Sequence, residues 1–332
     1  MSTAALPPLD TLLATARVVT LPLVTRFRGV ETREAVLLEG PEGWTEFSPF
    51  IEYDDREAAT WLAGALDFGW TPAPPPVRTA VPVNATVPAV AADRVDAVLD
   101  RFDGCRTAKV KVAERGQVLA DDVARVRAVR RRLGPEGRVR IDANGGWNVD
   151  EAERAVHALA EFDLEYVEQP CAEIDELAQL RERIGYLDIP VAADESVRKA
   201  DDPLRVARAG AADLLVIKAQ PLGGIHRALR VVAEAGLPAV VSSALDTSVG
   251  LAMGAALAAA LPTLAHDCGL GTASLFTADV VSDPLVARDG LLPLVRPRPT
   301  DAELDRVAAS ADRRDWWLAR LERCHDLLQA AG

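Results

Sequence analysis

The stretch Thr107-Ala108-Lys109-Val110-Lys111-Val112 places two lysines two positions apart in a run that otherwise suits a buried strand. Alternate residues of a strand face the same side, so Lys109 and Lys111 point together. On an open sheet with one wet face, such lysines are simply solvated. In a parallel barrel, helices cover the outward face and the inward face opens into a site, so both lysines would meet an anion or a metal-bound substrate.

The bulk composition permits a barrel and disfavours several other functions. The 332 residues suit a barrel of about 250 residues with an accessory domain. A net charge of −13 argues against nucleic acid or an anionic membrane as a partner, while a small carboxylate in a local cationic pocket stays possible. No feature points to a protein partner. The cysteines are scattered without C-x-x-C pairs and the start of the sequence does not resemble a signal peptide, so we expect a cytoplasmic protein.

The order of the predicted elements divides the chain into three parts. Residues 1–76 show strands first and a helix after them, which predicts an α+β capping domain ending in a proline-rich linker. Residues 77–280 are the predicted barrel. Residues 281–332 are expected to pack back on the capping domain and complete it.

A repeat of about 25 residues predicts the barrel itself. Apolar, strand-like runs recur at residues 80–86, 107–112, 138–142, 164–168, 189–193, 213–218, 238–242 and 263–267. Amphipathic or alanine-rich helical segments lie between most of them, and this spacing suits one βα unit. No G-x-G-x-x-G follows the first run, so a parallel α/β barrel is favoured over an open doubly wound sheet.

Five charged residues stand at the carboxyl ends of successive predicted strands: Lys111, Asp142, Glu168, Asp194 and Lys218. Any one carboxylate could merely cap the next helix or accept backbone N–H groups. Three on neighbouring strands would repel one another unless a divalent cation gathers them. Oxygen ligands favour Mg²⁺, with Mn²⁺ as a substitute.

This arrangement suits removal of a proton from the carbon next to a carboxylate. Mg²⁺ stabilises the enediolate charge that develops on that carboxylate. A lysine can act as the base if its pKa is lowered, and a neighbouring ammonium such as Lys109 beside Lys111 lowers it by repulsion.

The motifs that carry this chemistry, in order, are Lys109-x-Lys111, Asp142-Ala143-Asn144, Glu168-Gln169-Pro170, Asp194-Glu195-Ser196 and Lys218. They resemble the muconate-lactonizing subgroup of the enolase superfamily over nearly the whole chain. The resemblance implies a capping domain over a modified (β/α)₈ barrel of the (β/α)₇β type, with Asp142, Glu168 and Asp194 as Mg²⁺ ligands. It places Lys111 and Lys218 on opposite faces of the substrate and Glu195 behind the metal ligands, although strand register alone does not decide between Asp194 and Glu195.

Shorter pieces resemble a dehydrating branch of this subgroup. They are Glu46-Phe47-Ser48-Pro49-Phe50, Tyr53-Asp54, residues 242–250 and residues 268–272. The resemblance implies syn dehydration of a succinyl-hydroxycyclohexadiene carboxylate in menaquinone biosynthesis. Lys111 would abstract the proton and return it to the departing hydroxide, while Lys218 would hold charge on the other face.

Four further residues are candidates for contacting the substrate. Ser242 and Ser243 follow the seventh predicted strand and could hold the succinyl carboxylate, but they could equally form a turn with a helix N-cap. Arg28 could close over the substrate from the N-terminal loop, although a solvated arginine explains it as well. Asn144 belongs to the motif around the first predicted metal ligand.

Other functions remain open. An N-succinylamino acid racemase or a dipeptide epimerase needs a base on each face, and Lys111 with Lys218 provides both. The segment His266-Asp267-Cys268-Gly269 lacks the Asp-x-Asp typical of the dipeptide epimerases, which counts against that branch. Muconate cycloisomerization is a third possibility. A non-catalytic barrel that binds a carboxylate is disfavoured because neither a lysine nor a ligand is missing.

Overall fold

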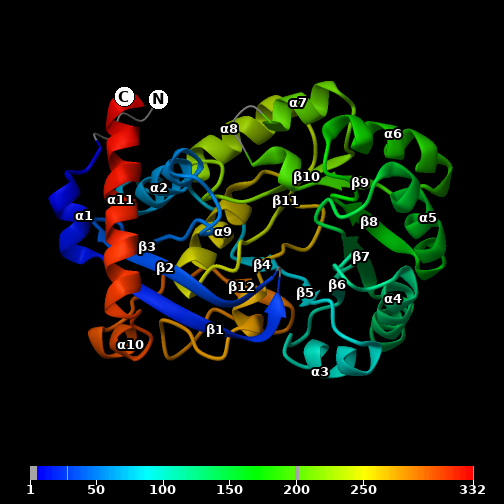
Figure 1. Ribbon diagram of the computed structural model, residues 1–332, viewed down its shortest axis with the longest axis horizontal. Coiled ribbons are helices and arrows are strands. Elements are labelled where there is room, and N and C mark those ends of the chain that lie inside the picture. The colour runs from blue at the N-terminus through cyan, green and yellow to red at the C-terminus, as the bar shows by residue number, and fades with distance from the viewer. Residues whose placement is uncertain (1–5, 28, 199–201, 332) are drawn as a thin grey trace.

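The computed structural model describes residues 6–27, 29–198 and 202–331. Arg28, a predicted substrate contact, lies outside the described residues. The chain forms a capping domain with an antiparallel sheet beside a barrel with a parallel one (Figure 1). The capping domain contains α1 (Leu9–Thr15), β1 (Arg17–Phe27), β2 (Val30–Gly40), β3 (Gly43–Phe47) and α2 (Asp55–Trp70).

Helix α2 forms the layer over the capping sheet. Asp54 caps its N-terminus by accepting a hydrogen bond from the Glu57 amide at 2.8 Å. Its apolar face buries Trp61 and Leu62 in a core shared with the C-terminal helix. These contacts join α2 and the C-terminal helix in one capping core.

The barrel sheet contains seven parallel strands, each paired with its neighbour in chain order. They are β5 (Ala85–Val87), β6 (Thr107–Lys111), β7 (Arg138–Asp142), β8 (Leu164–Glu168), β9 (Val191–Ala193), β10 (Leu214–Ile217) and β11 (Ala239–Val241). The connecting helices cover the outside: α3 (Val95–Leu99), α4 (Leu119–Leu133), α5 (Val149–Leu159), α6 (Ile174–Ile184), α7 (Asp202–Arg208), α8 (Ile225–Ala235) and α9 (Ser248–Ala260). Because the strands are parallel, their carboxyl ends meet at one face of the barrel.

The eighth predicted strand, at residues 263–267, is wrong. His266 instead contacts Glu165 at 2.8 Å, and Asp267 accepts a hydrogen bond from Thr107 at the first residue of β6. These polar contacts keep the segment at the amino end of the strands. Closure comes just after it, through two isolated parallel bridges, Val83 with Cys268 and Ser242 with Gly269.

The first predicted barrel strand, at residues 80–86, is divided in two. Its first part, β4 (Ala80–Pro82), pairs antiparallel with β12 (Leu291–Pro293), and only β5 joins the barrel sheet. Asn84 lies between the two parts, and its backbone N–H donates a hydrogen bond to the Cys268 carbonyl at 2.9 Å. The C-terminal segment therefore contributes a strand beside the barrel as well as helices.

The C-terminal helices pack on the capping domain, as the fold class predicted. They are α10 (Asp301–Arg306) and α11 (Ala311–Ala331). Trp317 of α11 is buried and donates a hydrogen bond to Glu34 of β2 at 2.9 Å. The exact boundaries at residues 76 and 280 stay predictions. Among the described helices, none combines the length and apolar character needed to span a bilayer.

Candidate active site

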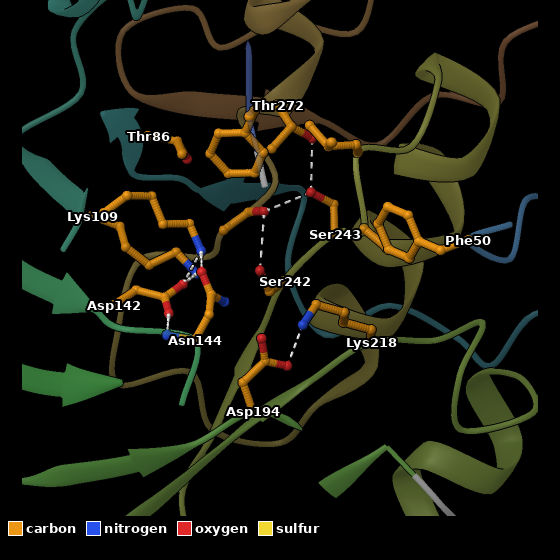
Figure 2. A pocket seen from close by; sticks show the side chains of 15 residues that line it. Phe50, Thr86, Lys109, Asp142, Asn144, Asp194, Lys218, Ser242, Ser243 and Thr272 are labelled. Atoms are coloured by element: carbon orange, nitrogen blue, oxygen red, sulfur yellow. Dashed lines mark hydrogen bonds and ion pairs between the residues drawn. The ribbon is translucent and has the colours of Figure 1, made fainter. Parts of the chain in front are cut away.

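A small cavity lies at the carboxyl ends of the barrel strands. Eight of the predicted site residues line it: Lys109, Lys111, Asp142, Asn144, Asp194, Lys218, Ser242 and Ser243. Figure 2 shows Lys109 and Asp142 on one side of the cavity, with Lys218, Ser242 and Ser243 across from them. Lys109 and Lys111 are therefore buried and point into the cavity and not into solvent.

Strands β6 and β7 set Lys111 and Asp142 side by side. The two residues are direct partners in the strand register, and their side chains form an ion pair. Lys111 Nζ also donates a hydrogen bond to Asn144 Oδ1 at 2.7 Å. Asn144 has a positive φ of 47° and its amide bonds to Asp142 Oδ1 at 3.0 Å, which turns its side chain back toward the lysine. The structure thus places Asn144 against the candidate base.

Lys109 is held by two carboxylates. Its Nζ lies 2.7 Å from Glu168 Oε1 and 3.2 Å from Asp142 Oδ2. Burial by itself would lower the pKa of Lys109, but the Glu168 and Asp142 carboxylates outweigh burial and raise it above its usual value. Lys109 is therefore an ion-paired ammonium in this arrangement, and not the bare neighbouring charge that we expected beside Lys111.

Glu168 is a buried carboxyl with too little positive charge around it. Its Oε2 atom is buried and has no hydrogen-bond partner. Burial, followed by repulsion from Asp142, raises the pKa of Glu168 to about 8. An orphaned carboxylate oxygen beside two further acids, Asp142 and Asp194, is the kind of environment that a divalent cation stabilises.

Among the described residues, the carboxylates are not already arranged around one metal position. Within residues 6–27, 29–198 and 202–331, no three histidine, cysteine, aspartate or glutamate side chains are grouped closely enough to hold a metal ion. Lys109 contacts both Asp142 and Glu168, and Lys218 pairs with Asp194. The donor set fits Mg²⁺ by its chemistry, and the lysines supply the positive charge in this arrangement.

Gln169 fixes the third carboxylate. This residue, the middle of the Glu168-Gln169-Pro170 motif, accepts hydrogen bonds through Oε1 from the amides of Asp194 at 2.9 Å and Ser196 at 3.1 Å. The motif therefore connects the end of β8 to the segment after β9. The sequence alone does not reveal this role of Gln169, because the role depends on a contact between two strand ends.

Lys218 follows β10 and approaches the cavity from the side opposite Lys109 (Figure 2). Its side chain is buried and pairs with Asp194. Burial lowers the pKa of Lys218 below its usual value, although the Asp194 carboxylate opposes this shift. A lysine of lowered pKa facing the cavity suits proton transfer or charge stabilisation.

Glu195 is not one of the residues that line the cavity, and its place behind the metal ligands stays a prediction. Its Oε1 accepts hydrogen bonds from Asn144 Nδ2 at 3.2 Å and Arg198 Nη2 at 2.5 Å. Arg198 in turn donates to the hydroxyl of Tyr53 in the capping domain. A continuous polar chain therefore runs from the capping domain to Asn144, the partner of Lys111.

Ser242 and Ser243 form part of the wall and do not cap α9, whose N-cap is Thr247. Both hydroxyls donate toward the Gly269 carbonyl, at 3.4 and 3.0 Å. The alternative of a helix N-cap is therefore wrong for both serines. Their side chains face the cavity, where a substrate can compete for the hydroxyl groups.

Sequence reasoning missed several residues of the cavity, among them Phe27, Phe50, Thr86 and Thr272. The Phe27 ring lies 5.2 Å from Lys111 Nζ and covers it from the capping domain. Phe50 and Thr272 belong to two of the short pieces that carry the resemblance, but no local pattern shows that these pieces meet in the fold. Thr86 lies next to Lys109 in the strand register, which is the signal that could have found it.

Comparison with known proteins gives the family. A model described as Enolase C-terminal domain-like matches residues 91–299, and one described as Enolase N-terminal domain-like matches residues 18–69. Proteins named o-succinylbenzoate synthase from Mycolicibacterium smegmatis and Mycobacterium tuberculosis are both 55% identical to the chain, covering 97% of it and 98% and 97% of themselves. The chain belongs to the o-succinylbenzoate synthase family of the enolase superfamily.

Solved structures of the enolase superfamily share this fold. The muconate lactonizing enzyme from Pseudomonas fluorescens, complexed with muconolactone, has a TM-score of 0.76 at 21% identity and covers 89% of the chain and 98% of itself. The 2-chloromuconate cycloisomerase from Rhodococcus opacus has a TM-score of 0.74 at 23% identity, with the same coverage. The predicted enolase-type architecture is confirmed.

Proposed function

We propose that the chain is a Mg²⁺-dependent o-succinylbenzoate synthase, a cytoplasmic lyase of menaquinone biosynthesis. Its substrate would be 2-succinyl-6-hydroxy-2,4-cyclohexadiene-1-carboxylate. The observation that carries the proposal is identity of 55% over nearly the whole chain with proteins of that name. The lysines and carboxylates around one cavity support it, because they suit removal of a proton next to a carboxylate.

Asp142, Glu168 and Asp194 are the proposed ligands of Mg²⁺. The orphaned oxygen and raised pKa of Glu168 support this assignment. When bound, Mg²⁺ supplies a Lewis acid that stabilises negative charge on the substrate carboxylate. Glu195, which contacts Asn144 and Arg198, is a supporting residue for these ligands.

Lys111 is the proposed base and acid. Its neutral amine takes the proton from C1 of the ring, and the C–H electron pair becomes the charge delocalised into the carboxylate. The C6–O bond then breaks, and the Lys111 ammonium donates its proton to the departing hydroxide. The products are water and the aromatic succinylbenzoate, so protons and electrons balance. One lysine is enough because both events occur on one face.

Lys218 and the serine wall orient the substrate. Lys218 lies across the cavity from the Lys109 side, where a cation would stabilise charge delocalised over the ring (Figure 2). Ser242 and Ser243 are the proposed contacts of the succinyl carboxylate, and Asn144 holds the Lys111 amine in place. Arg28 stays a predicted contact from the N-terminal loop.

The test is identification of the product. Purified protein stripped with EDTA would be given the substrate, with and without added Mg²⁺, and the product followed by ultraviolet absorbance and NMR. We expect rapid formation of o-succinylbenzoate only with Mg²⁺. A folded protein that forms none at any Mg²⁺ concentration would contradict the proposal.

Racemization of N-succinylamino acids is the second candidate. It is favoured by one observation, that Lys111 and Lys218 both line the cavity and could each act as a base. Exchange of the α-proton in D₂O reports this activity. Exchange that is faster than dehydration of the cyclohexadiene substrate would make racemization the main reaction.

A further inference from the structure

Glu46 of the capping domain reaches into the barrel. It lies on β3, and its side chain is fully buried. Its Oε2 accepts hydrogen bonds from the Thr247 amide at 3.0 Å, the Thr247 hydroxyl at 2.6 Å and the Gly250 amide at 3.1 Å. Its Oε1 accepts one from the Ser48 hydroxyl at 2.6 Å. Three of the four donors therefore belong to the other domain.

These bonds complete the N-terminus of α9. The first turn of α9 has no acidic residue of its own, and Thr247 caps only the Val249 amide, at 3.1 Å. Helix N-termini need acceptors for their free amides, and the Glu46 oxygens supply them. A side chain at Gly250 would place its Cβ 2.7 Å from the Glu46 carboxyl carbon, so glycine leaves room for the carboxylate to approach.

The turn before α9 is held by a contact from the capping domain and by a hydrogen bond within the turn itself. Arg33 of β2 donates to the Leu245 carbonyl at 3.3 Å, and Asp246 accepts from the Ala244 amide at 3.3 Å. Leu245 has a positive φ of 59°, a conformation that costs free energy for a leucine. Contacts from the capping domain therefore hold a backbone shape that the turn does not favour by itself.

This turn forms part of the cavity wall. Ala244 and Leu245 line the cavity next to Ser242 and Ser243. We propose that Glu46 is a positioning residue, whose carboxylate fixes the turn 244–247 and thereby sets the cavity wall against the non-reacting part of the substrate. The choice of substrate rests on the proposed function, whereas the link between Glu46 and the turn does not.

The proposal predicts an effect on binding more than on chemistry. Lys111 and Asp142 are set by the pairing of β6 with β7, which Glu46 does not touch. Loss of Glu46 therefore leaves proton transfer intact and loosens the wall. Such a loss of contacts shared by the ground state and the transition state raises KM and leaves kcat nearly unchanged.

Asp67 provides a matched control. It also belongs to the capping domain and also receives barrel helix amides, those of Ile225 at 2.7 Å and His226 at 3.3 Å at the start of α8. None of the described residues that line the cavity lies on α8. Asp67→Ala should therefore loosen a domain contact of the same kind without moving the wall.

The experiment compares Glu46→Ala, Glu46→Gln and Asp67→Ala by steady-state kinetics and by hydrogen exchange of the 244–250 amides. We expect KM to rise about 10-fold or more in Glu46→Ala, since small misplacements of a substrate site have large effects, with kcat within about 3-fold. Glu46→Gln keeps an oxygen acceptor and the volume of the side chain, so its KM should stay near that of the wild type. Asp67→Ala should leave KM and the exchange at 244–250 near wild type.

Two results would overturn the inference: equal KM changes in Glu46→Ala and Asp67→Ala, or unchanged exchange at 244–250 in Glu46→Ala. If Glu46→Ala does not fold, Glu46→Asp replaces it, because the shorter side chain draws the carboxylate away from Gly250. Absence of turnover by the wild-type protein would instead be a failure of the proposed function. The exchange of the 244–250 amides then decides the inference alone.

Discussion

Asp142, Glu168 and Asp194 stand at the ends of three neighbouring segments, and lysines hold all three. This arrangement balances buried charges that would otherwise be too costly to keep ionised. Glu168 is the exception, since one of its oxygens has no partner and its pKa is raised to about 8. Of these three carboxylates, Glu168 is therefore the one that a bound cation would stabilise most.

The first prediction concerns Mg²⁺ and stability. A ligand that binds only the folded state adds about 2.7 kcal/mol at 100 times its Kd, so Mg²⁺ should raise the melting temperature of the wild-type protein. Glu168→Gln should lose this response. Glu165→Gln is the control, because Glu165 lies on the same strand but pairs with Arg140 and His266. A Glu168→Gln variant that Mg²⁺ stabilises as strongly as the wild type would refute the ligand assignment.

The second prediction concerns pH. Burial, together with the Asp246 carboxylate, raises the pKa of Glu46 from about 4.5 to about 7 in the folded protein. The folded state then binds a proton that the unfolded state has lost, so the contribution of Glu46 to stability is full below pH 4.5 and falls as the pH rises to 7.

Glu46→Gln should therefore flatten the pH dependence of stability between pH 4.5 and 7. Urea unfolding of the wild type and of Glu46→Gln across this range gives the difference between their free energies of unfolding. The contributions of the other titrating groups cancel in this difference. Curves that stay parallel would show that Glu46 titrates normally.

At the scale of elements, the interface between α2 and the barrel leaves no space for an extra methyl group at one glycine. A Cβ at Gly64 would lie 2.9 Å from the Gln220 Cα and 3.0 Å from its carbonyl oxygen. Both are backbone atoms, so the elements themselves would have to move apart.

Gly64→Ala should lower the free energy of unfolding by about 1–3 kcal/mol, as overpacking typically does. Gly185→Ala is the control, because nothing lies within 4 Å of a Cβ there and its φ of −54° suits alanine. It should be neutral or slightly stabilising. Equal losses in the two variants, measured by denaturant unfolding, would argue against tight packing at this interface.

The elements also show what sequence can and cannot reveal. Lys111, Asp142 and Glu168 each end a short strand, so a local pattern predicts both the element and the direction of the side chain. The closing bridge at Cys268 was displaced from its predicted place because the polar contacts of His266 and Asp267 lie far away in the chain. Contacts such as Glu46 with Thr247, 201 residues apart, leave no local pattern at all.

At the scale of the whole molecule, the two ends of the chain form one capping core. Trp317 of α11 is buried against Phe47, with ring centroids 6.0 Å apart, and bonds to Glu34. Phe47 directly follows Glu46 on β3. The C-terminal helix thereby supports the strand that carries the proposed positioning residue.

Trp317→Ala should lower the free energy of unfolding by about 3–5 kcal/mol, as loss of a large buried side chain does. Trp316→Ala is the control, because Trp316 is only partly buried. This variant should lose clearly less free energy of unfolding than Trp317→Ala. Chemical denaturation measures both. A loss in Trp317→Ala no larger than in Trp316→Ala would mean that α11 contributes little to the capping core.

In the proposed reaction, Lys111 moves the proton of a Mg²⁺-dependent dehydration. The most direct measurement is kcat with saturating Mg²⁺ for wild type and Lys111→Ala, using 2-succinyl-6-hydroxy-2,4-cyclohexadiene-1-carboxylate and confirming the fold of each protein by circular dichroism. We predict rapid turnover by the wild type and a loss of at least about 10³-fold in Lys111→Ala, within the usual range for a general base. A folded Lys111→Ala protein that retains most of the wild-type kcat would show that Lys111 is not the base.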